Sequence, residues 1–182
     1  MNISVFCASS HPNNPEITVA ATELGRRIAI AGHTLLYGGS NLGLMGNVSG
    51  AAMYNGGRVV AVIPTFFSEE IINSQKVSQI IRVKSMAERK EYLIANSDAF
   101  IALPGGIGTL DEILEVMVDN QLGPIRNNNH KDKPIILYSP NGFYDNFIRQ
   151  IKTMRENGFF RSGRAPNISA YESMDEITRT IL

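Results

Sequence analysis

Residues 34–43 read Thr34-Leu35-Leu36-Tyr37-Gly38-Gly39-Ser40-Asn41-Leu42-Gly43. The first four predict a short buried strand, and the glycines that follow predict a turn into a helix. The same order of apolar run, loop and helical pattern recurs along the chain. Strands that alternate with helices favour a mostly parallel sheet covered by helices on both faces. We therefore predict a doubly wound α/β fold of three layers.

On both sides of residues 34–43, apolar runs predict strands and the segments between them predict helices. Two of the predicted helices are expected to begin near Pro15 and Gly43. The strands are predicted at 3–7, 34–37, 58–63, 79–83, 99–103, 134–138 and 168–171. The later helices are predicted at about 85–97, 109–121 and 143–157, with a last one after 173. Capping boxes are predicted at the starts of three of them, at Ser85/Glu88, Thr109/Glu112 and Ser173/Glu176. Residues 66–76 show no period and are predicted to form a long loop in the place of a substrate lid.

Length and composition exclude several classes of protein. The 182 residues suit a single domain over 1–182, and 17 Lys and Arg balance 17 Asp and Glu, so nucleic acid is not an expected partner. The N-terminus has no basic segment of a secretory signal, and no apolar run approaches the ~20 residues that span a bilayer. We expect a soluble cytoplasmic protein without a membrane partner. Cys7 is the only cysteine and is expected to be buried, and the three histidines are scattered, so no metal site is expected.

Three loops at the predicted strand ends have compositions suited to an anion. They are 8–10 (Ala-Ser-Ser), 38–40 (Gly-Gly-Ser) and 104–109 (Pro-Gly-Gly-Ile-Gly-Thr). Glycine lets backbone N–H groups approach a phosphate, and a following helix adds the positive end of its dipole. Any one loop could be a simple turn, but three at the carboxyl edge of a parallel sheet favour a binding site.

Two common nucleotide motifs are absent from the sequence. No G-x-x-x-x-G-K-[ST] stretch occurs, so a P-loop triphosphate site would lack its lysine. Gly106-Ile107-Gly108 is followed by Asp111 where the dinucleotide fingerprint has a third small residue. Neither NAD nor FAD is expected, and no other cofactor is predicted.

Charged residues occur one turn into two of the predicted helices. Arg89 and Lys90 follow Ser85, while Glu112 and Glu115 follow Thr109 on nearly the same helix face. If neighbouring strands feed these helices, Arg89 and Glu112 meet above the sheet edge. The residues leave two other interpretations open: Arg89 could be a solvated helix residue, and Glu112 could complete a capping box with Thr109.

Several ordered motifs resemble one known family. Residues 104–112, Pro-Gly-Gly-Ile-Gly-Thr-Leu-Asp-Glu, match the P-G-G-x-G-T-x-x-E signature of the "lonely guy" cytokinin-activating phosphoribohydrolases. Residues 86–90 match their M-x-x-R-K element. Residues 7–10, 37–46 and 121–123 are also similar, so the resemblance covers most of the chain. The longest motif is the most specific.

The resemblance implies a Rossmann-like fold, a homodimer and hydrolysis of AMP-like nucleotides, including N6-substituted ones, to a free base and ribose 5-phosphate. It also implies that Arg89 and Glu112 are the catalytic pair. Together with the glycine loops, it predicts substrate contacts for Ser9, Ser10, Gly38, Gly39, Lys90, Gly105, Gly106, Ile107, Gly108, Thr109, Leu110, Asp111 and Glu115. Family members have carried the label lysine decarboxylase, but the sequence offers no visible pyridoxal phosphate site.

The residue types suit this chemistry. Cleavage of a ribosyl C–N bond passes through an oxocarbenium-like transition state, which a carboxylate can stabilise while it orients or deprotonates water. Arg89 can hold phosphate or ribose oxygens, and its charge is expected to keep Glu112 ionised. The main alternative is a carrier or sensor that binds purine nucleotides without turnover, and a second is a structural oligomer whose glycine loops only form turns.

The chain departs from the family pattern near the expected base pocket and dimer seam. Ala87 stands where many members have histidine, residues 118–120 replace an aromatic segment, and the turn 124–132 is longer. The predicted helix from Thr109 carries apolar residues on more than one side, which fits burial against both the sheet and a partner helix. Those residues are Leu110, Ile113, Leu114 and Met117. A crowded monomer core is the alternative.

Overall fold

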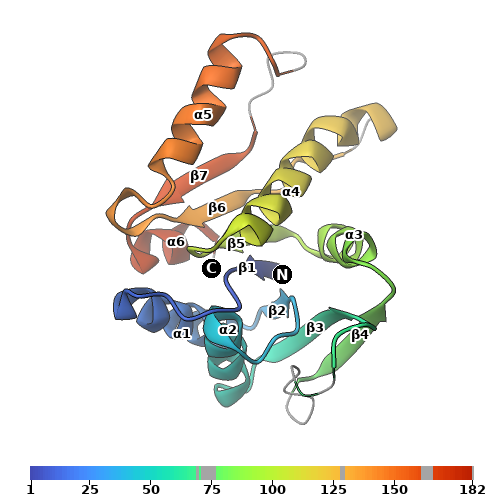
Figure 1. Ribbon diagram of the computed structural model, residues 1–182, viewed down its shortest axis with the longest axis vertical. Coiled ribbons are helices and arrows are strands. Elements are labelled where there is room, and N and C mark those ends of the chain that lie inside the picture. Colours follow the sequence, from blue (N-terminus) through green and yellow to red (C-terminus); the bar gives the residue numbers. More distant parts are fainter. Residues whose placement is uncertain (69, 71–76, 128–129, 161–165, 182) are drawn as a thin grey trace.

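The computed structural model describes residues 1–68, 70, 77–127, 130–160 and 166–181 (Figure 1). In this part of the chain, seven strands form one sheet in the order β4-β3-β2-β1-β5-β6-β7. Every neighbouring pair is parallel, so the prediction of a mostly parallel sheet is confirmed and no antiparallel strand occurs among the described residues. The strands are β1 (Asn2–Phe6), β2 (Thr34–Tyr37), β3 (Arg58–Pro64), β4 (Gln79–Val83), β5 (Ala99–Ala102), β6 (Ile135–Tyr138) and β7 (Ile168–Tyr171).

Helices cover both faces of this sheet, as predicted (Figure 1). The described helices are α1 (Pro15–Ile30), α2 (Gly43–Tyr54), α3 (Met86–Asn96), α4 (Ile107–Arg126), α5 (Asp145–Glu156) and α6 (Met174–Ile181), and a 3-10 turn, η2 (Pro140–Gly142), precedes α5. Pro15 occupies the first turn of α1, where a missing N–H costs nothing, and the Asn14 side chain accepts a hydrogen bond from the Glu16 N–H.

Alternate residues of each strand supply two separate apolar cores. On one face Ile3 and Val5 pack among residues of α1, α2 and α6. On the other face Phe6 packs among residues of α3, α4 and α5, and its ring stacks on Phe100 with centroids 5.6 Å apart. Because both faces are covered, the inner strands β3, β5 and β6 read as nearly continuous apolar runs. This is why they were recognisable in the sequence.

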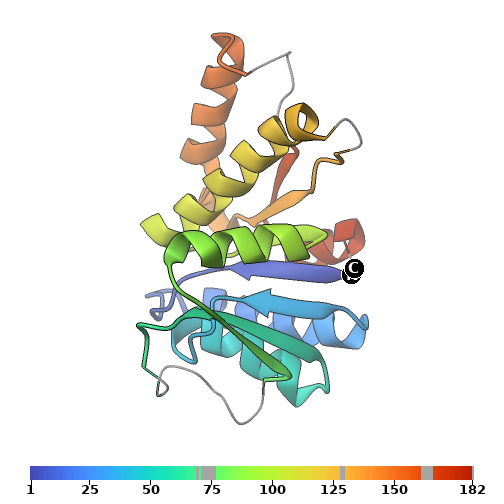
Figure 2. The same cartoon turned by 90° about the vertical axis from the view of Figure 1, so that its right-hand side faces the viewer.

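The strand order reverses between β1 and β5, which are paired at the centre of the sheet. From β1 the chain builds outward through β2, β3 and β4, and β5 then starts the other half on the opposite side of β1. Figure 2 shows α3 and α4 beginning at the edge where the strands end. In open parallel sheets this switch point forms the crevice in which ligands bind. The loops that follow β1, β2 and β5 all reach it.

Two predicted boundaries of α4 are wrong. The helix begins at Ile107 with Gly106 as its N-cap, so Thr109 lies inside the first turn and does not start a capping box with Glu112. It also continues to Arg126, beyond the predicted end near Gln121 and through Pro124. The capping boxes of the other two helices are confirmed, since the N–H groups of Glu88 and Glu176 donate to the serine hydroxyls that precede them. Residues 69 and 71–76 of the predicted lid loop lie outside the described residues.

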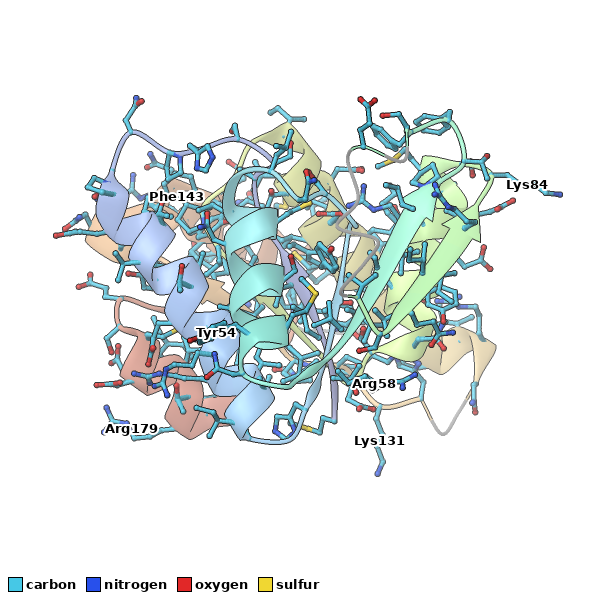
Figure 3. All side chains as sticks on the ribbon, turned by 90° about the horizontal axis from the view of Figure 1, so that it is seen from below. Tyr54, Arg58, Lys84, Lys131, Phe143 and Arg179 are labelled. Carbon is cyan, nitrogen blue, oxygen red and sulfur yellow. The ribbon has the colours of Figure 1, made fainter. Side chains whose placement is uncertain are left out.

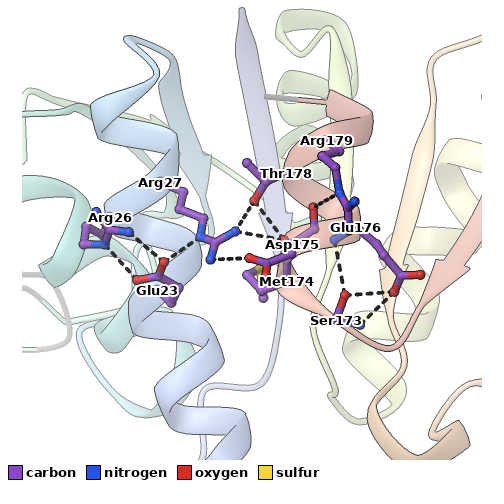
Figure 4. A network of polar contacts seen from close by, with 9 residues as sticks. All are labelled: Glu23, Arg26, Arg27, Ser173, Met174, Asp175, Glu176, Thr178 and Arg179. Atoms are coloured by element: carbon purple, nitrogen blue, oxygen red, sulfur yellow. Dashed lines mark hydrogen bonds and ion pairs between the residues drawn. The ribbon is translucent and has the colours of Figure 1, made fainter.

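Polar contacts fasten the last helix to the first (Figure 4). Arg27 on α1 forms an ion pair with Asp175 at 2.7 Å and donates a hydrogen bond to the Thr178 hydroxyl at 2.7 Å. Other charged side chains lie on the surface, and Lys84, Lys131 and Arg179 project from separate parts of it (Figure 3). These contacts hold the last helix of the described chain against α1.

Candidate functional site

A cavity of about 310 Å³ opens at the switch point of the sheet. Its walls come from the loop after β1, the first turns of α2, α3 and α4, and the glycine-rich loop after β5. The described residues that line it are Cys7, Ala8, Ser9, Ser10, Met45, Met86, Arg89, Gly106, Gly108, Thr109, Asp111 and Glu112. This volume lies at the lower end of the range for small-molecule sites, roughly 300–1,000 Å³.

Arg89 and Glu112 meet in this cavity from two different helices. The Arg89 Nη2 donates a hydrogen bond to Glu112 Oε1 at 2.8 Å, and the two residues are only 6% and 5% exposed. The alternatives left open by the sequence, a solvated arginine and a capping glutamate, are therefore wrong. The Arg89 Nε has no hydrogen-bond partner among the described residues. A buried charged donor without an acceptor is costly, so a bound oxygen atom would be favoured there.

Gly38 provides the space through which Arg89 reaches Glu112. A Cβ on Gly38 would lie 2.0 Å from the Arg89 Nη2 and 2.7 Å from its Cζ. No side chain fits at that separation, so any other residue would displace the guanidinium. Gly38, predicted to contact the substrate, does not line the cavity and instead shapes it through Arg89.

The electrostatic environment of Glu112 differs from the expectation that Arg89 keeps it ionised. Burial raises the pKa of Glu112 to about 7, although the neighbouring Arg89 guanidinium acts in the opposite direction. The carboxyl group therefore binds a proton more readily than an exposed glutamate does. A catalytic carboxyl whose pKa lies near the working pH can both accept and return a proton. Burial also raises the pKa of the Cys7 thiol, which makes it a weak nucleophile.

Two helix N-termini at the cavity edge lack a polar residue at the cap. Leu42 precedes α2 and Gly106 precedes α4, so neither cap side chain can accept from the N–H groups of the first turn. A Cβ on Gly106 or Gly108 would project into open space, so these glycines leave the cavity clear beside the start of α4. Thr109 is buried next to them, 3% exposed. The arrangement suits an anion with several oxygen atoms.

The serine loop is held against the start of α2 by a close backbone approach. A Cβ on Gly43, whose φ is +56°, would lie 2.4 Å from the carbonyl carbon of Ser9 and 2.5 Å from the Ser10 nitrogen. The Met45 N–H donates to the Ala8 carbonyl at 3.2 Å. Only glycine allows both the positive φ and this contact. The loop after β1 is thus positioned to place both serines in the cavity.

The cavity gathers most of the predicted site residues from the β5–α4 segment but leaves others outside. Lys90 and Glu115 pair with each other at 3.0 Å beside the cavity, and Ile107 is 82% exposed. Gly105 borders a smaller apolar cavity of about 200 Å³ on the other side of the glycine-rich loop. The predicted residues that do not line the main cavity are Gly38, Gly39, Lys90, Gly105, Ile107, Leu110 and Glu115.

Four lining residues were missed as site residues: Cys7, Ala8, Met45 and Met86. Each belongs to a motif that the sequence does show, at the residues flanking the polar or glycine positions. Met86 lies one helical turn before Arg89, and its sulfur accepts a long contact of 3.8 Å from the Arg89 Nη1. The sequence offered one signal for Met86, its position one turn before Arg89. An apolar residue at the start of a helix is equally typical of core packing, so this signal was not decisive.

Among the residues that the structure describes, no group of three or more His, Cys, Asp or Glu is arranged to hold a metal ion. No described helix is long and apolar enough to cross a membrane.

Comparison with known proteins finds both sequence relatives and structural neighbours. The family described as "Possible lysine decarboxylase" matches residues 45–181. The chain is 42% identical over 160 residues to the "Probable cytokinin riboside 5′-monophosphate phosphoribohydrolase LOGL2" of Oryza sativa subsp. japonica, covering 87% of this chain and 63% of that relative. It is 38% identical over 180 residues to "Cytokinin riboside 5′-monophosphate phosphoribohydrolase LOG1" of Arabidopsis thaliana, covering 98% of this chain and 81% of the relative.

A solved structure of the molybdenum cofactor carrier protein MCP from Chlamydomonas reinhardtii superposes with a TM-score of 0.69. The match covers 99% of this chain and 94% of that chain, at 21% sequence identity. At this identity the likeness establishes the Rossmann-like fold and nothing about the ligand.

Proposed function

This chain belongs to the family of cytokinin riboside 5′-monophosphate phosphoribohydrolases, and from that premise we propose that it hydrolyses the N-glycosidic bond of AMP-like 5′-monophosphates. Water and the nucleotide are converted to ribose 5-phosphate and a free base, either adenine or an N6-substituted adenine. The observation that carries the proposal is the buried contact of Arg89 with Glu112, 2.8 Å long, in a cavity between glycine-rich loops.

The phosphate is held at the start of α4. Gly106, Gly108 and Thr109 line this end of the cavity, and the glycines leave their backbone open to a ligand. The N–H groups of a first helical turn and the helix dipole favour the two negative charges of a monophosphate. Ser9 and Ser10, which also line the cavity, can donate their hydroxyl hydrogens to phosphate or ribose oxygens. These local donors allow the protein to bind a monophosphate although its net charge is zero.

Glu112 acts at the ribose. In its ionised form the carboxylate stabilises the positive charge that develops at the sugar carbon as the C–N bond breaks, and it orients the attacking water. The proton that the water loses passes to Glu112 and from there to the departing base nitrogen, which releases a neutral base and restores the carboxylate. Burial of Glu112 excludes bulk water and strengthens these electrostatic interactions.

Arg89 fixes the geometry of the reacting groups. One guanidinium nitrogen bonds Glu112, and the Nε, which has no partner among the described residues, remains to donate to a ribose or phosphate oxygen. A planar guanidinium can bridge the carboxylate and the substrate in this way, whereas a lysine could not hold both directions. Arg89 thus links substrate binding to the position of the catalytic carboxyl.

The arrangement favours hydrolysis over the decarboxylation named in the family description. Enzymes that use pyridoxal phosphate bind it through a lysine Schiff base. None of the described residues lining the cavity is a lysine. The chemistry present is a carboxyl group, a guanidinium and open backbone, which suits glycosidic bond cleavage.

A non-catalytic carrier or sensor is the second candidate function, because a carrier protein shares the fold. The two functions separate in one experiment: the purified protein is incubated with AMP or isopentenyl-AMP, and free base is measured by chromatography. The proposal predicts release of adenine or isopentenyladenine in catalytic amounts. Nucleotide binding without base release would instead support the carrier.

We further propose that the chain forms a homodimer through α4. Ile113 and Met117 are buried in the monomer core, but one side of α4 leaves apolar side chains 42–62% exposed. They are Leu114, Val118, Leu122 and Ile125. Val118 and Leu122 line a groove of about 630 Å³ between α3 and α4, which also contains Ala87. In a twofold-symmetric dimer, the apolar side of α4 in each copy would be buried against the other copy. Several departures from the family pattern also fall on this face.

Two other expectations stay predictions. One sheet runs through the described chain, which supports a single domain over residues 1–182. A cytoplasmic location rests on the sequence alone.

A further inference from the structure

A second bridge joins α3 to α4 beside the buried pair. Lys90 follows Arg89 on α3, and Asp111 precedes Glu112 on α4. The Lys90 Nζ donates to Asp111 Oδ1 at 3.1 Å and to Glu115 Oε2 at 3.0 Å. The Lys90 side chain is 15% exposed, whereas those of Asp111 and Glu115 are 53% and 50% exposed. Lys90 therefore lies under the two carboxylates, and only Asp111 of these three lines the cavity.

This bridge constrains the relative position of the two helices. Asp111 and Glu115 are one helical turn apart, so a single ammonium that bonds both fixes α3 along the axis of α4. The two carboxylates are half exposed, and ion pairs of such groups contribute about 0–1 kcal/mol to stability, so we expect the bridge to affect the alignment of α3 and α4 more than the overall free energy of folding. Lys90 and Asp111 are adjacent in the sequence to Arg89 and Glu112, whose side chains meet in the cavity. A shift of α3 along α4 would separate Arg89 from Glu112.

The same bridge also balances charge around Glu112. The titratable and charged groups facing this carboxyl are Arg89 and Lys90 from α3, the Cys7 thiol after β1, and Asp111 from α4 itself. Beyond the larger effects of burial and Arg89, the Asp111 carboxylate raises the pKa of Glu112 and the Lys90 ammonium lowers it. Lys90 keeps its charge: burial lowers its pKa, but Asp111 and Glu115 raise it by more. Lys90 thus offsets the negative charge that Asp111 places beside the reacting carboxyl.

We propose that Lys90 is a positioning residue, which aligns Arg89 with Glu112 by bridging α3 to Asp111 and Glu115 and offsets the charge of Asp111 at the Glu112 carboxyl. This rests on the proposed function in so far as Glu112 is the catalytic carboxyl. It differs from the direct substrate contact that the family resemblance predicts for Lys90, because the ammonium is already bonded to two carboxylates outside the lining of the cavity.

The test measures the titration of Glu112 in the full chain without ligand. Carbon NMR follows the carboxyl signals of labelled glutamates, and the signal that is missing in Glu112→Gln identifies Glu112. Lys90→Met is expected to raise the midpoint by about 0.5 pH unit, and Asp111→Asn to lower it by a similar amount. Lys90→Arg keeps the charge and should restore the wild-type midpoint. Lys152→Met removes a lysine from an exposed pair on α5 and serves as the control.

Activity supplies the second readout, through the pH profile of kcat/KM with AMP, which reports the free enzyme's catalytic carboxyl. The acid limb should move with the NMR midpoint in each variant, and Lys90→Met should lower kcat more than it raises KM. An unmoved Glu112 midpoint in both Lys90→Met and Asp111→Asn would overturn the inference. So would a large rise in KM with an unchanged pH profile, which a direct nucleotide contact predicts. If the NMR shifts occur but wild-type protein releases no base, the proposed function fails and the electrostatic coupling stands.

Discussion

Gly38 and Arg89 occupy mutually exclusive space: a Cβ on Gly38 would lie 2.0 Å from the Nη2 of the Arg89 guanidinium. Glycine at this position is therefore required by the observed conformation of Arg89, the proposed catalytic arginine, in a loop whose composition otherwise suggests only a turn or a phosphate contact. The relationship connects the strand end of β2 with a helix that begins 48 residues later, at Met86.

Gly38→Ala should reduce base release by about 100-fold, because displacing a catalytic group by about 1 Å has effects of that size. Stability should change little, since the clash falls on the far end of a flexible side chain. The measurement is kcat/KM with AMP together with the melting temperature. Gly50→Ala is the control: a Cβ there meets nothing within 4 Å, so this change on α2 should preserve activity and add about 0.5–1 kcal/mol of stability.

The pKa of Glu112 predicts how stability depends on pH. Its folded value of about 7 lies above the ordinary value of 4.5, so the folded protein binds this proton more tightly than the unfolded chain. The resulting stability is present below pH 4.5 and is lost as pH rises through 7. At 1.36 kcal/mol per pKa unit, the loss is about 3 kcal/mol between pH 4 and pH 8.

Glu112→Gln lacks this titration. Its free energy of unfolding relative to wild type should therefore rise by about 3 kcal/mol over the same pH interval, as measured by urea denaturation at the two pH values. Glu156→Gln, at an exposed glutamate on α5, should show little such change. A constant difference between Glu112→Gln and wild type would mean that burial does not control this carboxyl.

Gly108→Asp separates folding from ligand binding. An aspartate in the first turn of α4 suits the helix dipole, by about 0.3–1 kcal/mol, so the melting temperature without ligand should stay the same or rise. Its carboxylate would occupy the open space beside the proposed phosphate position. AMP at 100 times its dissociation constant should add about 2.7 kcal/mol to the stability of wild type and nothing to the variant. Equal stabilisation of both proteins would place the phosphate elsewhere.

Leu122→Glu tests the proposed dimer. Leu122 is 42% exposed on the apolar side of α4, and each dimer would lose two buried leucines worth roughly 1.5 kcal/mol or more apiece. The dimer dissociation constant should rise at least about 100-fold in sedimentation velocity. Ile30→Glu, at an exposed isoleucine ending α1, should leave the association unchanged. A wild-type protein that sediments as a monomer would contradict the proposal directly.

The sequence predicted the inner strands well because both faces of the sheet are buried there, which makes β3, β5 and β6 nearly continuous apolar runs. The edge strands β4 and β7 are partly exposed and contain polar residues, so their pattern is weaker. The sequence predicted the start of α4 poorly. Thr109 and Glu112 have the spacing of a capping box, but Gly106 is the N-cap and the Glu112 side chain bonds Arg89 instead. A local pattern could not reveal this, because the competing partner is 23 positions away.

The outline of the candidate site could be predicted because most of its polar and glycine residues belong to recognisable motifs. Residues in ordered motifs, such as Arg89 and Gly108, were found, whereas Met45 and Met86 were missed because an apolar residue near a helix start has many uses. The raised pKa of Glu112 could not be predicted from sequence at all. Arginine as a neighbour suggested a lowered value, and only the depth of burial shows that desolvation outweighs it.

The most direct test of the account compares wild type with Glu112→Gln in two measurements on the same preparations, AMP binding by calorimetry and the rate of adenine release at saturating AMP. The account predicts similar dissociation constants, because the phosphate contacts are intact, and a rate at least about 100-fold lower in the variant. Equal rates of adenine release from the two proteins would contradict the central claim that Arg89 and Glu112 form the catalytic pair.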